Sequence, residues 1–258
     1  MFGFKKQRRK RLGNQPFPPA WLEIIERNVP IYRRLSKADQ KELQGHVLVF
    51  LAEKNFEGCG GLELTDEIKV TVAAQACILL LHRETDYYPG LYSILVYPGA
   101  YIAKTHVELA PGHYAETEQV RLGESWKRGA LILSWDDVLA SAGDVHDGHN
   151  VVLHEFAHQL DTEDGPANGA PPLPRRSMYV AWARILAKDY AELQKDAREG
   201  RPTVLDEYGA TNPAEFFAVA TESFFEKPVE LRRQHPELYE ELKLYFQQDP
   251  AQAGQEDA

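Results

Sequence analysis

The sequence predicts an α+β fold in which strands precede a central apolar helix and further helices follow it. Three observations support this class. Segments with helix-capping residues fill residues 20–82. Two strongly strand-like runs come next, at 91–97 and 131–135. The apolar helical run at 151–161 and the helical patterns after it place the expected sheet ahead of that helix.

Caps and turn residues set the expected elements in chain order. A first helix is expected at residues 20–32. Ser36 is suited to cap a second helix that runs to about Leu51, and Thr65 or Asp66 a third that runs to about His82. The remaining predictions are weaker strands at 107–109 and 119–122, a helix near 177–198, a helix that starts at Pro213 after Asn212, and a last helix at about 236–247.

Length and composition indicate one domain. The chain has 258 residues, of which 43% are hydrophobic, and this is enough for a sizeable core. We expect a domain at 17–249 between a disordered basic tail at 1–16 and a disordered tail at 250–258. The two cysteines, Cys59 and Cys77, form no disulfide framework and are compatible with a cytoplasmic protein. No run of ~18 apolar residues predicts a membrane span.

Charge is divided unevenly along the chain. Residues 1–11 carry six basic side chains and no acidic one, whereas the whole chain has a net charge of −10. Without those six charges the remainder is at −16. An acidic body argues against direct nucleic-acid binding, which depends largely on neutralising phosphates. The basic segment could contact acidic lipid or nucleic acid, although such segments are more often simply solvated.

A His-Glu-x-x-His motif, His154 to His158, lies inside the central apolar run. Histidines four apart share one face of a helix, about one turn apart, so their imidazoles can bind the same metal ion. Glu155 is placed to take a proton from a water whose pKa a zinc ion lowers to roughly 7. The motif therefore predicts one zinc ion per chain, held by His154 and His158, with Glu155 as general base.

A third zinc ligand is needed, and the residues alone leave alternatives open. Glu215 and Glu222 share a face of the apolar helix that starts at Pro213, where a buried carboxylate needs a partner. Glu215 also fits a capping box with Asn212, which would occupy its carboxylate without a metal. Asp164 lies six residues after the second histidine, but Asp161 stands where that ligand pattern has glycine.

Several long runs resemble one family, the Mlc titration factor A proteins, which are zinc-dependent metallopeptidases. The resemblance is carried by residues 129–138, 150–161, 165–173 and 208–225. It implies a zincin-like domain, with a mixed sheet beside the active-site helix, and a gluzincin-like site similar to the anthrax lethal factor catalytic domain. In that pattern a tyrosine precedes the glutamate ligand by seven residues. The resemblance thus implies Glu215 as the third ligand and Tyr208 as a catalytic residue that donates to the oxyanion.

The resemblance also implies a function. We expect a zinc peptidase, aminopeptidase-like, that acts on peptide substrates. The same protein could also bind an Mlc-like transcriptional repressor and so regulate sugar uptake genes. The alternative is a non-catalytic module that binds such a repressor, with a regulatory or vestigial zinc site. A second carboxylate that orients a zinc-binding histidine is expected from Asp161 or Glu222.

The strand at 131–134 is the candidate sheet edge along which an extended peptide substrate would pair.

Overall fold

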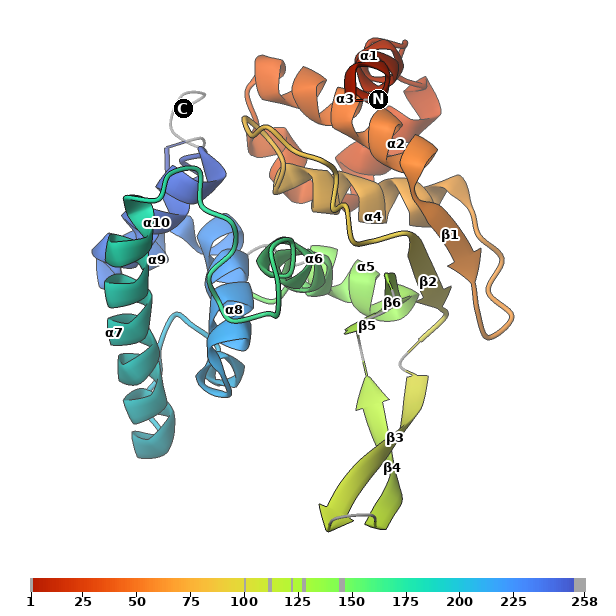
Figure 1. Cartoon of the computed structure of the whole chain (residues 1–258). Helices are drawn as coiled ribbons and strands as arrows, with labels where there is room; N and C mark the ends of the chain where they lie inside the picture. The colour runs from red at the N-terminus through yellow and green to blue at the C-terminus, as the bar shows by residue number, and fades with distance from the viewer. Residues whose placement is uncertain are drawn as a thin grey trace.

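The computed structural model describes residues 2–99, 101–110, 113–121, 123–126, 129–143 and 147–252. Within these residues, helices predominate around a small sheet, as Figure 1 shows. The sheet strands lie ahead of the helix that carries the His-Glu-x-x-His motif, and helices follow it. This arrangement confirms the predicted α+β class.

The capped helices in the first third of the chain are present. Ser36 caps α3 (Lys37–Glu53) through its hydroxyl, and Thr65 caps α4 (Asp66–Ile78) in the same way. The first predicted helix is shorter than expected, because α2 (Pro19–Asn28) ends before Pro30. Proline has no N–H to continue the helix and disfavours helical backbone in the preceding residue. A 3-10 helix, η1 (Pro30–Arg34), follows instead.

The prediction of a disordered tail at 1–16 differs from the structure. Residues Phe2–Gly13 form a helix, α1, which packs against α3. Arg9 donates to Glu53 over 2.7 Å, and Lys5 lies 2.9 Å from Asp86. The carboxylates that order this segment come from residues more than 40 positions away in the sequence. The sequence of the segment therefore shows its basic charges, but not the distant carboxylates that pair with them in the folded protein.

The sheet has four strands in the order β1-β2-β6-β5. β1 (Asn55–Gly58), β2 (Ser93–Tyr97) and β6 (Ala130–Ser134) are parallel, and β5 (Gly123–Trp126) pairs antiparallel to β6. The expectation that 131–134 forms an exposed edge is wrong, because β6 lies between β2 and β5. The edge on that side is β5, which contacts the motif helix.

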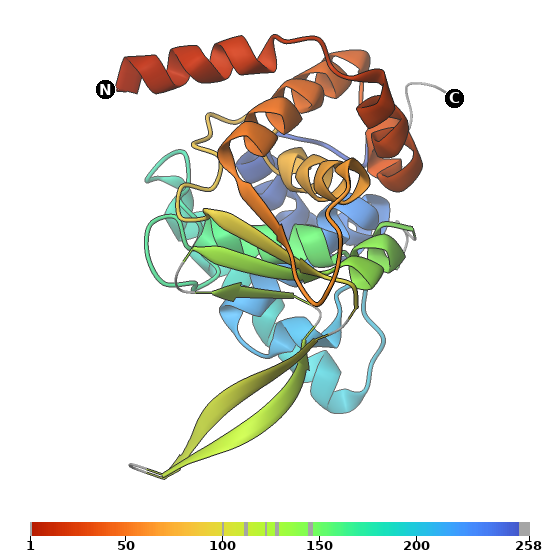
Figure 2. The same cartoon turned by 90° about the vertical axis from the view of Figure 1, so that its right-hand side faces the viewer.

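The chain between β2 and β5 forms a two-stranded antiparallel ribbon. β3 (Tyr101–Ala110) pairs with β4 (His113–Arg121), as expected for the weaker strand patterns there. Leu122, the last residue of one predicted strand, lies outside the described residues. The ribbon extends away from the sheet and the helices in both views (Figures 1 and 2).

The helices after the sheet contribute one part of the apolar core, and α3 and α4 contribute another. Trp135 begins a helix, α5 (Trp135–Gly143), rather than ending the preceding strand. The elements that follow are α6 (Val151–Asp161), α7 (Met178–Glu199), η2 (Glu207–Ala210), α8 (Pro213–Glu226), α9 (Pro228–Gln234) and α10 (Pro236–Phe246). α8 lies between α6 and α7 in Figure 1, and its Phe216, Phe217 and Phe224 are buried.

The expected tail at 250–258 is ordered where it is described. Ala251 is buried, and its N–H donates to the hydroxyl of Tyr239 over 3.0 Å. Residues 253–258 lie outside the described part. Among the described helices, none combines the length and apolar character needed to cross a membrane.

Candidate metal centre

Helix α6 places both motif histidines on the face toward α8. Asn150 caps the helix, and its side-chain oxygen accepts from the N–H of Leu153 over 3.0 Å. Leu153, Phe156 and Ala157 are buried, and Phe156 packs against Tyr88 at a ring distance of 4.8 Å. Because this side of α6 is fixed in the core, His154 and His158 have little freedom to rotate away from α8.

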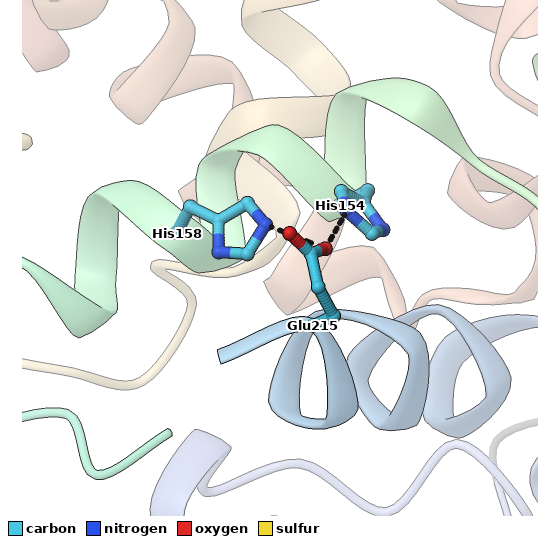
Figure 3. A group of neighbouring side chains, drawn as sticks. All are labelled: His154, His158 and Glu215. Atoms are coloured by element: carbon cyan, nitrogen blue, oxygen red, sulfur yellow. Dashed lines mark hydrogen bonds and ion pairs between the residues drawn. The ribbon is translucent and has the colours of Figure 1, made fainter. Parts of the chain in front are cut away.

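Helix α8 supplies the facing carboxylate. Pro213 occupies its first turn, and the side chain of Asn212 accepts from the N–H groups of Ala214 and Glu215. The predicted cap and start of this helix are thus confirmed. The carboxylate of Glu215 does not turn back to the cap, as a capping box would require, but points to the two histidines (Figure 3).

His154, His158 and Glu215 converge on one point. The Nε2 atoms of the two histidines lie 3.0 and 3.2 Å from the same oxygen, Oε2 of Glu215. Candidate ligand atoms of the three residues are all within 4.8 Å of one another. All three side chains are largely buried but retain some solvent contact, so an ion and a water molecule could reach them.

Hydrogen bonds within the cluster strongly shift the pKa values of His154 and Glu215. Burial by itself would lower the pKa of His154, but hydrogen bonds to Glu215 and Glu222 raise it to about 10. Burial would raise the pKa of Glu215, but its bonds to His154 and His158 lower it to about 2. Near neutral pH His154 is therefore protonated and Glu215 ionised, and a divalent cation bound here would displace that proton.

Glu222, one of the two predicted orienting carboxylates, bonds His154 on its other ring nitrogen. Oε1 of Glu222 lies 2.7 Å from Nδ1 of His154, and Oε2 accepts from the backbone N–H of Asn150 over 2.5 Å. An ionised carboxylate only accepts, so Nδ1 carries the proton and Nε2 is directed to the cluster. Glu222 is consequently not among the three converging residues.

Asn150 links this carboxylate to two other buried polar side chains, a role that our sequence analysis missed. Its amide donates to Gln75 over 2.8 Å and to Glu226 over 3.0 Å. The network joins α4, α6 and α8 behind His154. An N-cap asparagine directly before the motif helix was the visible signal, but its partners lie about 75 residues away on either side.

Glu155 and Tyr208, the two predicted catalytic residues, lie beside the cluster. Glu155 follows His154 on α6 and is 7% exposed. The ring of Tyr208 in η2 lies 6.0 Å from the ring of His154 and is 54% exposed, so it borders the site from the solvent side. Asp206 holds the start of η2 by accepting from the N–H of Tyr208 over 2.7 Å.

Asp161 and Asp164 are not brought into the cluster. Asp164 is exposed and belongs to none of the candidate metal groups among the described residues. Asp161 is fully buried and accepts from the N–H of Gly169 over 2.8 Å. Its carboxylate thus anchors the loop after α6, and the bond expected toward a histidine belongs to Glu222 instead.

The donor set of His154, His158 and Glu215 fits a divalent metal ion. Two imidazole nitrogens and one carboxylate oxygen are the usual protein ligands of a catalytic zinc, with a fourth position left for water or substrate. Two other groups of described residues also have candidate ligand atoms within 4.8 Å of one another: Asp39, Glu42 and His82, and Asp189, Glu192 and His235. Each of those groups includes a single histidine, and neither lies on the His-Glu-x-x-His helix.

Comparison with known proteins gives a consistent family. The sequence profile described as glucose-regulated metallo-peptidase M90 matches residues 4–247. An uncharacterized protein of Synechocystis sp. is 45% identical over 245 residues, covering 94% of this chain and 89% of the relative. Mlc titration factor A of Klebsiella pneumoniae (strain 342) is 31% identical over 243 residues, covering 93% and 89%. Mlc titration factor A of Yersinia pestis (strain Pestoides F) is 31% identical over 233 residues, covering 89% and 84%. The motif helix, the facing glutamate and these matches together show that the chain belongs to the M90 family of glucose-regulated metallopeptidases.

Proposed function

We propose that this protein is a zinc-dependent peptidase with a zincin-like catalytic domain and aminopeptidase-like specificity. The observation that supports it best is the convergence of two imidazole Nε2 atoms and the Glu215 carboxylate, at 3.0 and 3.2 Å, beside Glu155. A purely structural metal site needs no adjacent general base and no neighbouring tyrosine hydroxyl. The aminopeptidase-like specificity rests on the family resemblance.

The metal would be held by His154, His158 and Glu215. A bound zinc ion would polarise the substrate carbonyl and lower the pKa of the attacking water. Glu222 keeps the Nδ1 proton on His154, so Nε2 stays available as a ligand. This fixed orientation means that no rearrangement of His154 is needed before catalysis.

Glu155 would act as the general base and then as the general acid. Its carboxylate takes a proton from the water that attacks the peptide carbonyl, and then gives that proton to the leaving amine. Glu155 is 7% exposed and directly follows His154 on α6, which supports its assignment as the group that exchanges this proton. Tyr208 would donate its hydroxyl to the oxyanion of the tetrahedral intermediate from the exposed side of the site.

The test is hydrolysis of chromogenic aminoacyl and N-blocked peptide substrates by zinc-loaded protein and by Glu155→Gln. We expect turnover by the parent protein and a loss of about 10²- to 10⁴-fold in the variant, with zinc content unchanged. Turnover of free-amine substrates alone would support the aminopeptidase assignment. Loss of zinc in Glu155→Gln, or equal turnover by both proteins, would contradict the role of Glu155.

A second candidate is binding of an Mlc-like transcriptional repressor, alone or together with peptidase activity. The observation in its favour is the 31% identity to proteins named Mlc titration factor A over about nine-tenths of the chain. A pull-down with a purified repressor of that type, using the parent and Glu155→Gln, separates the two functions. Capture by both proteins, with turnover by neither, would favour the binding module over the enzyme.

A further inference from the structure

Helix α1 uses one side to pack on the rest of the molecule. Gly13 approaches Gly45 of α3 so closely that a Cβ on Gly13 would lie 3.3 Å from the carbonyl oxygen of Gly45. One turn earlier, the guanidinium of Arg9 is largely buried between Glu53 and Asp86. This inner side fixes both the position and the rotation of α1 about its axis.

The six cations of α1 fall into two groups. Lys5, Arg8 and Arg9 form ion pairs with Glu53 and Asp86 on the inner side. The other three, Lys6, Lys10 and Arg11, are exposed, and no carboxylate of the described residues lies within ion-pair distance of them. These three positive charges lie within two turns of one helix, whereas the residues outside α1 carry a net charge of −16.

An exposed aromatic ring lies among these charges. The side chain of Phe4 is 82% exposed. With Gln7, Arg8, Lys10, Arg11 and Asn14 it lines a shallow groove along α1. Figure 2 shows α1 projecting past the other helices, with its first turn farthest from the body. The side of the helix that carries Phe4 is therefore accessible to a broad, flat surface.

We propose that the outward face of α1, formed by Phe4, Lys6, Lys10 and Arg11, binds anionic lipid headgroups at a membrane surface. Basic side chains near such a surface attract acidic headgroups, and an aromatic ring between them inserts at the boundary with the acyl chains. Nucleic acid also offers phosphates, but it has no apolar layer that would take up the exposed ring of Phe4.

The inner ion pairs give this surface a specific advantage. A free 12-residue peptide of this composition would be marginally helical in water, so binding would have to order it. Here Glu53 and Asp86 already hold the helix in place. The outward charges are thus arranged before contact, and less conformational entropy is lost on binding.

The test is co-sedimentation of the full chain with vesicles of phosphatidylcholine alone and with vesicles that also contain phosphatidylglycerol. We expect binding only to the anionic vesicles, and weaker binding as salt is raised. The variant Lys6→Gln/Lys10→Gln/Arg11→Gln should lose about fivefold in partition coefficient per charge removed. Glutamine is a good helix former, so α1 stays intact in this variant. Phe4→Ser should also weaken binding, with less effect on its salt dependence.

A matched control removes the same charge elsewhere. Arg175, Arg176 and Lys195 are exposed cations in and before α7, distant from α1 in Figure 1. Their triple change to glutamine should leave vesicle binding unchanged. Equal losses in both triple variants, or no binding of the parent protein to anionic vesicles, would overturn the proposal. The proposal would also be overturned if the parent protein bound a labelled DNA duplex more tightly than anionic vesicles at the same salt concentration, and if the α1 triple variant lost that DNA binding.

Discussion

Glu222 and His154 form a 2.7 Å hydrogen bond between a buried carboxylate and an imidazole Nδ1, on the side of the ring opposite Glu215. The second oxygen of Glu222 is held by the backbone N–H of Asn150, which starts the helix that carries His154. One carboxylate of α8 thereby fixes both the first turn of α6 and the orientation of its first histidine.

Glu222→Gln should weaken metal binding. Glutamine keeps the shape of the side chain but loses the charge that holds the Nδ1 proton of His154. We expect a loss of about 10- to 100-fold in zinc affinity, measured by competition with a chromogenic chelator. Glu230→Gln, at an exposed position of α9, is the control and should bind zinc as the parent does. An unchanged affinity in Glu222→Gln would show that this bond does not orient the ligand.

Tyr208→Phe should lower turnover while leaving zinc content and stability near those of the parent. In the proposed mechanism its hydroxyl acts only when negative charge develops on the substrate, so kcat should fall by about 10²- to 10³-fold with little change in KM. The exposed position of the ring predicts a small effect on the free energy of unfolding, within about 0.5 kcal/mol. Tyr92→Phe, at another exposed tyrosine, controls for loss of a surface hydroxyl. A kcat like that of the parent would exclude Tyr208 from the reaction.

Stability of the metal-free protein should depend on pH through the His154–Glu215 pair. The pKa of His154 is raised from 6.5 to about 10, so its contribution is complete below pH 6.5 and is lost as pH rises toward 10. The pKa of Glu215 is lowered from 4.5 to about 2, so its contribution is complete above pH 4.5 and is lost as pH falls toward 2. We expect the pair to stabilise the metal-free fold most between pH 4.5 and 6.5. Urea midpoints measured across pH for the parent and for His154→Gln test this, and parallel profiles would contradict it.

Gly169→Ala should destabilise the protein and disturb the metal centre. Gly169 has a φ of +77°, and a Cβ there would lie 2.4 Å from the carbonyl oxygen of Pro213, the first residue of the helix that carries Glu215. We expect a loss of about 1–3 kcal/mol in the free energy of unfolding, together with weaker zinc binding. Gly165→Ala, in the same loop, meets no atom within 4 Å and should be tolerated. A fully stable Gly169→Ala protein would mean that the loop shifts without strain.

The sequence determined the features of this protein that depend on local spacing. The His-Glu-x-x-His period places two imidazoles on one helix face, and the caps Ser36, Thr65 and Asn212 mark helix starts because their side chains bond nearby N–H groups. Short apolar, strand-like runs likewise indicated β2 and β6, and the order of these patterns along the chain indicated the α+β class.

The tertiary structure alone decided the features that depend on contacts between distant segments. Residue spacing left Glu215 and Glu222 open, and the family resemblance favoured Glu215. The structure shows Glu215 facing both Nε2 atoms, with the rotation of α8 set by packing against α6 and α7. It made β6 an inner strand, since the residues of one strand do not specify which strands pair with it. It also ordered α1, whose charges are balanced by Glu53 and Asp86 only after the chain has folded.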